Sequence, residues 1–195
     1  PSPSSETTTP QFPQYLDFYV LILEKQRNNL VQKQKKIGLY FGSFNPIHIG
    51  HLAIANYLLE FSGLDEIWFI ISPQNPLKEK TTLLPEYQRL QMVNLATGDF
   101  PRFKTSDIEF RLPKPSYTIH TLAYLSEKYP SRTFCLIMGA DNLESFGKWK
   151  NYNEIISNYR LYIYPRPGHD GGSFKNHENV HWVNAPLMEL SSSFI

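Results

Sequence analysis

The chain has 195 residues, of which 41% are hydrophobic and 19% charged, so it holds enough apolar material for the core of one domain. Nineteen Lys and Arg residues against eighteen Asp and Glu residues give a net charge of +1, which argues against a nucleic-acid partner, because such proteins usually present a strongly basic surface. No apolar stretch reaches the ~20 residues that span a bilayer, and the first residues are rich in Pro, Ser and Thr rather than basic and then apolar, so we expect a cytoplasmic protein with no membrane partner.

Residues 1–36 are predicted to form an extension outside the main domain. Residues 1–14 are rich in Pro, Ser and Thr, a composition typical of disorder. Residues 15–31 carry apolar side chains at helical spacing, which predicts a helix that is either a simple appendage or a partner-binding element. Because the chain stops at Ile195 without a closing element, we expect residues 37–195 to be a domain that lacks its C-terminal end.

From Ile37 onward, short apolar runs alternate with segments of helical period. This alternation predicts an α/β fold: a Rossmann-like, doubly wound parallel sheet with helices on both faces. Cys135 lies inside one apolar run and is expected in the core. Ligands bind such sheets beyond the carboxyl ends of the strands, so the loops after Phe41, Ile71 and Met138 are the candidate sites. The predicted strands are Ile37–Phe41, Ile67–Ile71, Phe134–Met138, Leu161–Tyr164 and Val180–Val183, and the predicted helices are His51–Phe61, Pro85–Ala96, Tyr117–Lys128 and Asn153–Ser157.

The loop after the first predicted strand has the features of a phosphate cradle. We expect Gly42 to permit a tight turn and Gly50 to let a ligand approach the start of the next helix. That helix start offers free amides and a partial positive charge, and two imidazoles lie beside it. The predicted cradle comprises Gly42, Ser43, Phe44, His48, Gly50 and His51.

The run His48-Ile49-Gly50-His51 resembles the H-x-G-H signature of the nucleotidyltransferase superfamily. That superfamily includes the adenylyltransferases of NAD and coenzyme A synthesis and is related to class I aminoacyl-tRNA synthetases. A synthetase does not fit, because the chain is too short for tRNA-binding domains and has no K-M-S-K-S segment. The signature indicates the superfamily and leaves the substrate open.

Two later segments carry polar groups that suit an acceptor. Lys78 follows the second predicted strand and two prolines, where a lysine can reach a phosphate, although a solvated surface lysine is the alternative. Ser116 and Thr118 are predicted to cap the helix that begins near Tyr117, so that its free amides suit a carboxylate.

The segments after the later strands complete the candidate site. Gly139 permits close approach by a nucleotide, and Asp141 can accept hydrogen bonds from ribose hydroxyls. Trp149 offers a flat face for a pyridine ring, with a plain core residue as the alternative. Arg166 lies between two prolines and lines either the adenosine side of the site or a rigid surface turn.

Taken together, these motifs resemble the bacterial nicotinate-nucleotide adenylyltransferase family over Ile37–Ile195. The run Ser191–Ile195 resembles the family's I-S-S-T-x-I-R segment, cut before its arginine. The sequence departs from the family's usual residues at Phe41, Asn45, Leu77 and His120.

The resemblance implies adenylyl transfer from ATP to nicotinic acid mononucleotide, with Mg²⁺ carried by ATP and no metal ligands from the protein. It implies catalytic roles for His48, His51 and Lys78. The alternatives are an adenylyltransferase for nicotinamide mononucleotide or phosphopantetheine, and a non-catalytic nucleotide-binding module. The implied ATP-binding residues are Gly42, Ser43, Phe44, His48, Gly50, His51, Gly139, Asp141, Arg166, Ser192 and Ser193, and the implied acceptor-binding residues are Ser43, Phe44, Lys78, Tyr117, Thr118 and Trp149.

Overall fold

The computed structural model describes residues 20, 34–73 and 83–185. The chain divides into two compact units, Pro1–Gln34 and Lys35–Ile195, and the fold below is that of the second unit. Except for Val20, the predicted helix at 15–31 lies outside the described residues, as do Lys78, Ser192 and Ser193. Among the helices that the structure does describe, none is long and apolar enough to cross a membrane.

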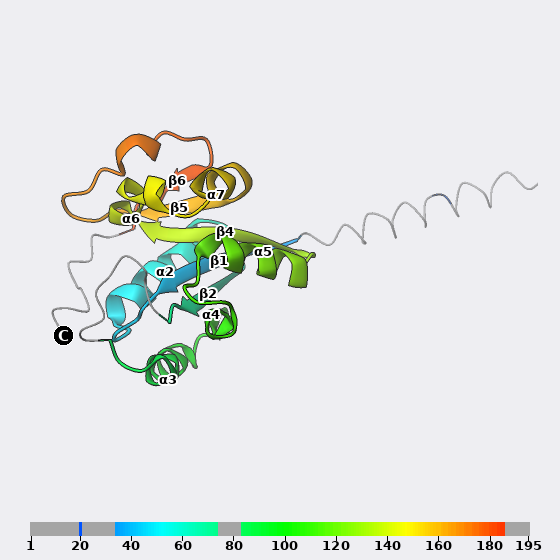
Figure 1. Ribbon diagram of the computed structural model, residues 1–195, viewed down its shortest axis with the longest axis vertical. Coiled ribbons are helices and arrows are strands. Elements are labelled where there is room, and N and C mark those ends of the chain that lie inside the picture. Colours follow the sequence, from blue (N-terminus) through cyan, green and yellow to red (C-terminus); the bar gives the residue numbers. More distant parts are fainter. Residues whose placement is uncertain (1–19, 21–33, 74–82, 186–195) are drawn as a thin grey trace, which may run out of the picture. The chain divides into compact units, whose positions relative to one another are not determined.

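Six parallel strands form the central sheet, in the order β3-β2-β1-β4-β5-β6 (Figure 1). The chain builds outward from β1 to β3 and then returns to place β4 on the other side of β1, so its direction reverses between β1 and β4. This is the doubly wound order predicted from the sequence, and sheets of this kind bind ligands at such a reversal. The strands are β1 (Lys35–Gly42), β2 (Glu66–Ile71), β3 (Phe103–Ser106), β4 (Arg132–Gly139), β5 (Arg160–Tyr164) and β6 (Val180–Trp182).

Helices cover both faces of the sheet, because successive residues of each buried strand point to opposite sides. In β1, Leu39 packs into the cluster formed with α5, α6 and α7, whereas Tyr40 packs into the cluster formed with α2 and α3. The helices are α2 (Ile49–Phe61), α3 (Glu86–Thr97), α4 (Ile108–Arg111), α5 (Thr118–Lys128), α6 (Ala140–Glu144) and α7 (Tyr152–Asn158), with 3₁₀ turns at Phe146–Lys148 and Gly172–Phe174.

The five predicted strands and four predicted helices are confirmed, with ends within two residues of those expected. Strand β3 was not predicted: of its four residues only Phe103 is buried, which is too short a pattern to distinguish from a loop. The short helices α4 and α6 were missed for the same reason. Cys135 lies in the core as expected, and burial raises the pKa of its thiol to about 11.

Candidate functional site

The loop after β1 owes its shape to Phe44 rather than to a turn at Gly42. Phe44 has a φ of 44°, in the left-handed region, while Gly42 has no positive φ. The Phe44 ring folds back over Gly42, where an added Cβ would lie 2.9 Å from it. The predicted turn role of Gly42 is therefore wrong, and the glycine makes room for a ring. Because Phe44 is 2% exposed and its ring packs against Phe69 and His51, its side chain is a core residue that a ligand cannot reach.

His48 and His51 lie together at the start of α2, with ring centroids 3.8 Å apart. His48 is the N-cap residue, and its backbone N–H donates to Nδ1 of His51 at 3.3 Å. Since Nδ1 of His51 accepts this hydrogen bond, the proton of the neutral ring lies on Nε2. Gly50 is buried in the first turn between them.

Both imidazoles are neutral donors rather than cations at neutral pH. Burial, together with the neighbouring charges of His48 and Arg166, lowers the pKa of His51 to about 3. Burial and Arg166 also lower the pKa of His48. The only full positive charge among these three side chains is therefore the guanidinium.

Arg166 reaches this site from the end of β5. Its Nε lies 3.8 Å from Oδ1 of Asp141, which is on α6 at the end of β4, and its guanidinium lies 5.4 Å from the Tyr164 ring centroid. Arg166 also begins the surface turn that was the alternative, because the N–H of His169 donates to its carbonyl at 3.1 Å and Pro167 and Gly168 between them are exposed. Its own side chain is 28% exposed and lies against Asp141. A Cβ on Gly139 would overlap Oδ1 of Asp141, so any side chain at position 139 would force this carboxylate to move.

Three buried side-chain atoms in the described residues have no hydrogen-bond partner: Nδ1 of His48, Oδ1 of Asp141 and Nε of Arg166. They come from the segments that follow β1, β4 and β5, three neighbouring strands of the sheet. Buried polar atoms without partners are rare, and each needs an explanation. Their concentration at the carboxyl ends of adjacent strands, beside the N-terminus of α2, indicates a site for a polar, anionic ligand.

On the other side of the sheet, the structure brings Tyr117 close to the segment that carries Trp149. The ammonium of Lys150 lies 4.6 Å from the Tyr117 ring centroid, and Tyr117 directly precedes the first helical residue, Thr118. Trp149 is partly buried, and its ring lies 5.4 Å from that of Phe146.

The predicted capping roles of Ser116 and Thr118 are wrong. The N-cap of α5 is Tyr117, and no side chain caps the helix. The hydroxyl of Ser116 instead donates to Oε2 of Glu109 at 3.1 Å. The amides of the first turn of α5 are thus left without a side-chain cap, as a carboxylate ligand would require.

Two buried charged residues behind these loops, Arg89 and Glu109, were missed by sequence reasoning. Arg89 shares the buried face of α3 with Val93 and Thr97, spaced at four-residue intervals, and that spacing was the available indication. Glu109 lies in a short helix that the periodicity did not reveal.

Residues 39–195 match the model of the cytidylyltransferase-like family. Similar proteins carry the name "Probable nicotinate-nucleotide adenylyltransferase". The one from Flavobacterium psychrophilum is 58% identical over 162 residues, covering 82% of this chain and 84% of its own length. The one from Bacteroides fragilis is 52% identical, covering 82% of this chain and 80% of its own length.

The chain belongs to the nicotinate-nucleotide adenylyltransferase family. Its fold is also that of a solved adenylyltransferase. The Plasmodium falciparum nicotinic acid mononucleotide adenylyltransferase, solved in complex with NaAD, superposes with a TM-score of 0.69 at 21% identity, over 82% of each chain.

Proposed function

We propose that this protein transfers the adenylyl group of ATP to nicotinic acid mononucleotide, releasing nicotinic acid adenine dinucleotide and pyrophosphate. The observation that carries the proposal is the group of three buried atoms without hydrogen-bond partners, on His48, Asp141 and Arg166, at the reversal point of the sheet. The last two lie 3.8 Å apart as an ion pair, which is too long for a hydrogen bond between them. The relatives' shared name supports the choice of acceptor.

The reaction needs positioning more than acid–base chemistry. An oxygen of the acceptor's 5′-phosphate forms a bond to the α-phosphorus of ATP, and the bond from that phosphorus to the oxygen bridging to the β-phosphate breaks. Pyrophosphate leaves with the electron pair. Because a phosphate monoester is already an anion at neutral pH, no general base is required, and catalysis rests on alignment and on stabilising charge in the transition state.

The donor site supplies that stabilisation. His51 donates from Nε2, His48 contributes its neutral imidazole, and Arg166 contributes an N–H without a hydrogen-bond partner and the positive charge. Asp141 is placed to accept from a ribose hydroxyl. No group of three or more His, Cys, Asp or Glu residues that could hold a metal ion occurs in the part of the chain that the structure describes. We propose that Mg²⁺ enters on the phosphate oxygens of ATP, where it neutralises charge.

We place the acceptor pocket between the start of α5, at Tyr117 and Thr118, and the segment that carries Trp149, because Lys150 in that segment lies 4.6 Å from the Tyr117 ring centroid. The uncapped amides at the start of α5 suit the carboxylate of the nicotinate ring, and Trp149 offers a flat face to that ring. Lys78, Ser192 and Ser193 remain predicted contacts.

The test is steady-state pyrophosphate release from ATP with each of three acceptors: nicotinic acid mononucleotide, nicotinamide mononucleotide and phosphopantetheine. A neutral amide would leave donors in the pocket unsatisfied, at a cost of ~1–3 kcal/mol, so kcat/KM should be ~10- to 100-fold higher for the nicotinate compound. A higher value for either other acceptor would overturn the substrate assignment. ATP binding in calorimetry without pyrophosphate release from any acceptor would identify a non-catalytic module.

A further inference from the structure

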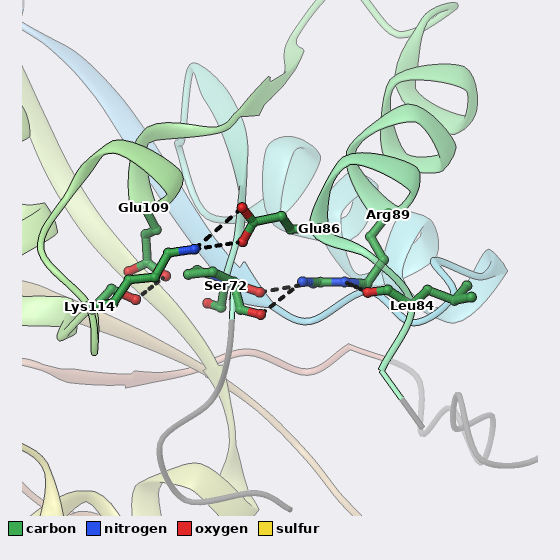
Figure 2. A network of polar contacts seen from close by, with 8 residues as sticks. Ser72, Leu84, Glu86, Arg89, Glu109 and Lys114 are labelled. Atoms are coloured by element: carbon green, nitrogen blue, oxygen red, sulfur yellow. Dashed lines mark hydrogen bonds and ion pairs between the residues drawn. The ribbon is translucent and has the colours of Figure 1, made fainter. Parts of the chain in front are cut away.

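A buried arginine ties together the loops that follow the first two strands. Arg89 on α3 has no exposed surface. Its guanidinium donates to the carbonyl oxygens of Ser43 (2.5 Å), Ser72 (2.9 Å) and Pro73 (3.0 Å), and its Nε donates to that of Leu84 (2.9 Å). Figure 2 shows the side chain extending from the helix toward Ser72 and Leu84. The forked shape of the guanidinium allows one side chain to hold several carbonyls in fixed positions, which a lysine cannot reproduce.

A buried carboxylate holds the segment before α5 in a similar way. Glu109 is 2% exposed and accepts hydrogen bonds from the hydroxyls of Ser116 (3.1 Å) and Thr121 (2.9 Å), and from the side chain of Ser72. Burial raises the pKa of Glu109, and the three hydroxyl donors partly offset that effect. A carboxylate buried among donors from three segments fixes the distances between those segments.

Ser72 joins the two side chains. Its hydroxyl contacts Glu109, its carbonyl accepts from Arg89, and its N–H donates to the carbonyl of Gly42 at 2.9 Å. One residue at the end of β2 thus connects β1, α3 and α4. The connected segments lead directly into the two halves of the site, since Ser43 precedes the loop with His48, and Ser116 precedes Tyr117.

We propose that Arg89, Ser72 and Glu109 form one positioning unit that sets the distance between the donor loop after β1 and the acceptor pocket at the start of α5. Neither charged side chain is a catalytic residue. Each acts by holding the backbone of residues that contact substrate. The inference rests on the proposed function, because it assigns those two loops to ATP and to the acceptor.

The two ends of the unit should affect different substrates. Glu109→Gln weakens the hold on Ser116 and should raise KM for nicotinic acid mononucleotide ~10-fold, with a change in KM for ATP below ~3-fold. Arg89→Lys loses the fork that spans Ser43, Ser72 and Pro73, and should raise both KM values and lower kcat ~10-fold or more. Ser72→Ala removes the shared hydroxyl and keeps the carbonyl, so it should follow the pattern of Glu109→Gln.

The matched control is Glu86→Gln. Glu86 lies one turn before Arg89 and pairs with Lys114 at 3.1 Å, joining α3 to the same segment before α5 from the exposed side (Figure 2). Exposed ion pairs contribute little, so this variant should keep wild-type kinetics within ~2-fold. The double variant Arg89→Lys/Glu109→Gln should lose less than the product of the single effects, because both act through Ser72.

Thermal midpoints and concentrations of folded enzyme separate positioning from stability. If the variants lower the midpoint but keep wild-type kcat and both KM values per folded molecule, the side chains are structural and the inference fails. Multiplicative effects in the double variant would show two independent supports rather than one unit. If the wild type forms no dinucleotide, it is the proposed function that has failed. The unit is then judged by ATP affinity in calorimetry, which Arg89→Lys must weaken several-fold more than Glu109→Gln does.

Discussion

We predict that the neutral imidazole of His51 acts as a hydrogen-bond donor through Nε2, and two closely related substitutions can test this. In the folded protein its Nδ1 accepts from the backbone of His48, so its Nε2 carries the proton that we propose is donated to ATP. Asparagine at this position places an amide oxygen near the Nδ1 position and no group near Nε2. Glutamine places an amide N–H near Nε2 and loses the acceptor.

The expected magnitudes follow from these contacts. Both variants lose the edge-on contacts of the ring with Phe44 (5.1 Å) and Tyr40 (6.0 Å), so their thermal midpoints should fall by similar amounts. His51→Asn also loses the donor, and one donor to a developing phosphoryl charge is worth ~3 kcal/mol, so kcat should fall ~10²-fold or more. His51→Gln should retain at least ~10-fold more activity than His51→Asn.

The assay is single-turnover formation of dinucleotide at saturating ATP and acceptor, with folded enzyme measured independently. Equal losses in the two variants would show that Nε2 does not act as a donor. Activity of His51→Asn within ~3-fold of wild type would remove His51 from the catalytic assignment altogether.

Three further predictions concern the charges and the packing around this site and beneath the sheet. Arg166→Met removes a charge-assisted contact and should weaken ATP binding ~10- to 100-fold in calorimetry, whereas an unchanged ATP affinity would place Arg166 outside the phosphate site. The same variant should raise the pKa of His51, followed by NMR, because the guanidinium helps to lower that pKa. Gly139→Ala should weaken ATP binding several-fold, because the added Cβ would overlap Oδ1 of Asp141 and push the carboxylate out of its position. A wild-type ATP affinity would contradict this steric role. At the opposite end of the sheet, burial of Glu66 acts to raise its pKa, but hydrogen bonds from Trp68, Lys35 and Lys104 outweigh burial and lower the pKa to about 2. The ionised carboxylate therefore stabilises the fold fully above its ordinary pKa of 4.5, and this stabilisation is lost as the pH falls through about 2. Because solvent screens the two half-exposed lysines, Glu66→Gln should cost on the order of 2 kcal/mol of unfolding free energy at pH 6. This cost should vanish once the pH is below about 2, and a difference that does not depend on pH would refute the assignment.

The sequence predicted well those helices and strands whose buried residues recur at a regular spacing along the chain. Strands such as β2, buried along its whole length, and helices such as α2 with a buried face carry a periodic pattern that depends only on local sequence. The cradle after β1 was recognisable because its histidines, glycines and proline lie close together along the chain.

The remainder depends on contacts between segments far apart in sequence. The glycine at position 42 looks like a turn residue until the Phe44 ring is seen above it. Ser116 looks like a helix cap until its hydroxyl is seen to donate to the Glu109 carboxylate instead. In the sequence, Arg89 looks like a surface residue of a helix. Its partners are the backbone carbonyls of Ser43, Ser72 and Pro73, and because every residue has a carbonyl, the sequence does not show which ones it binds.

The central claim is that the α-phosphorus of ATP is transferred to the acceptor. It is tested most directly by supplying ATP labelled at the α-phosphate together with nicotinic acid mononucleotide, and separating the products by chromatography. The account predicts that the label appears in nicotinic acid adenine dinucleotide and that the pyrophosphate released is unlabelled, in equal molar amounts of the two products. Two results would contradict the proposed transfer. One is label recovered as AMP, and the other is label that stays in ATP although both substrates and a measured concentration of folded protein are present.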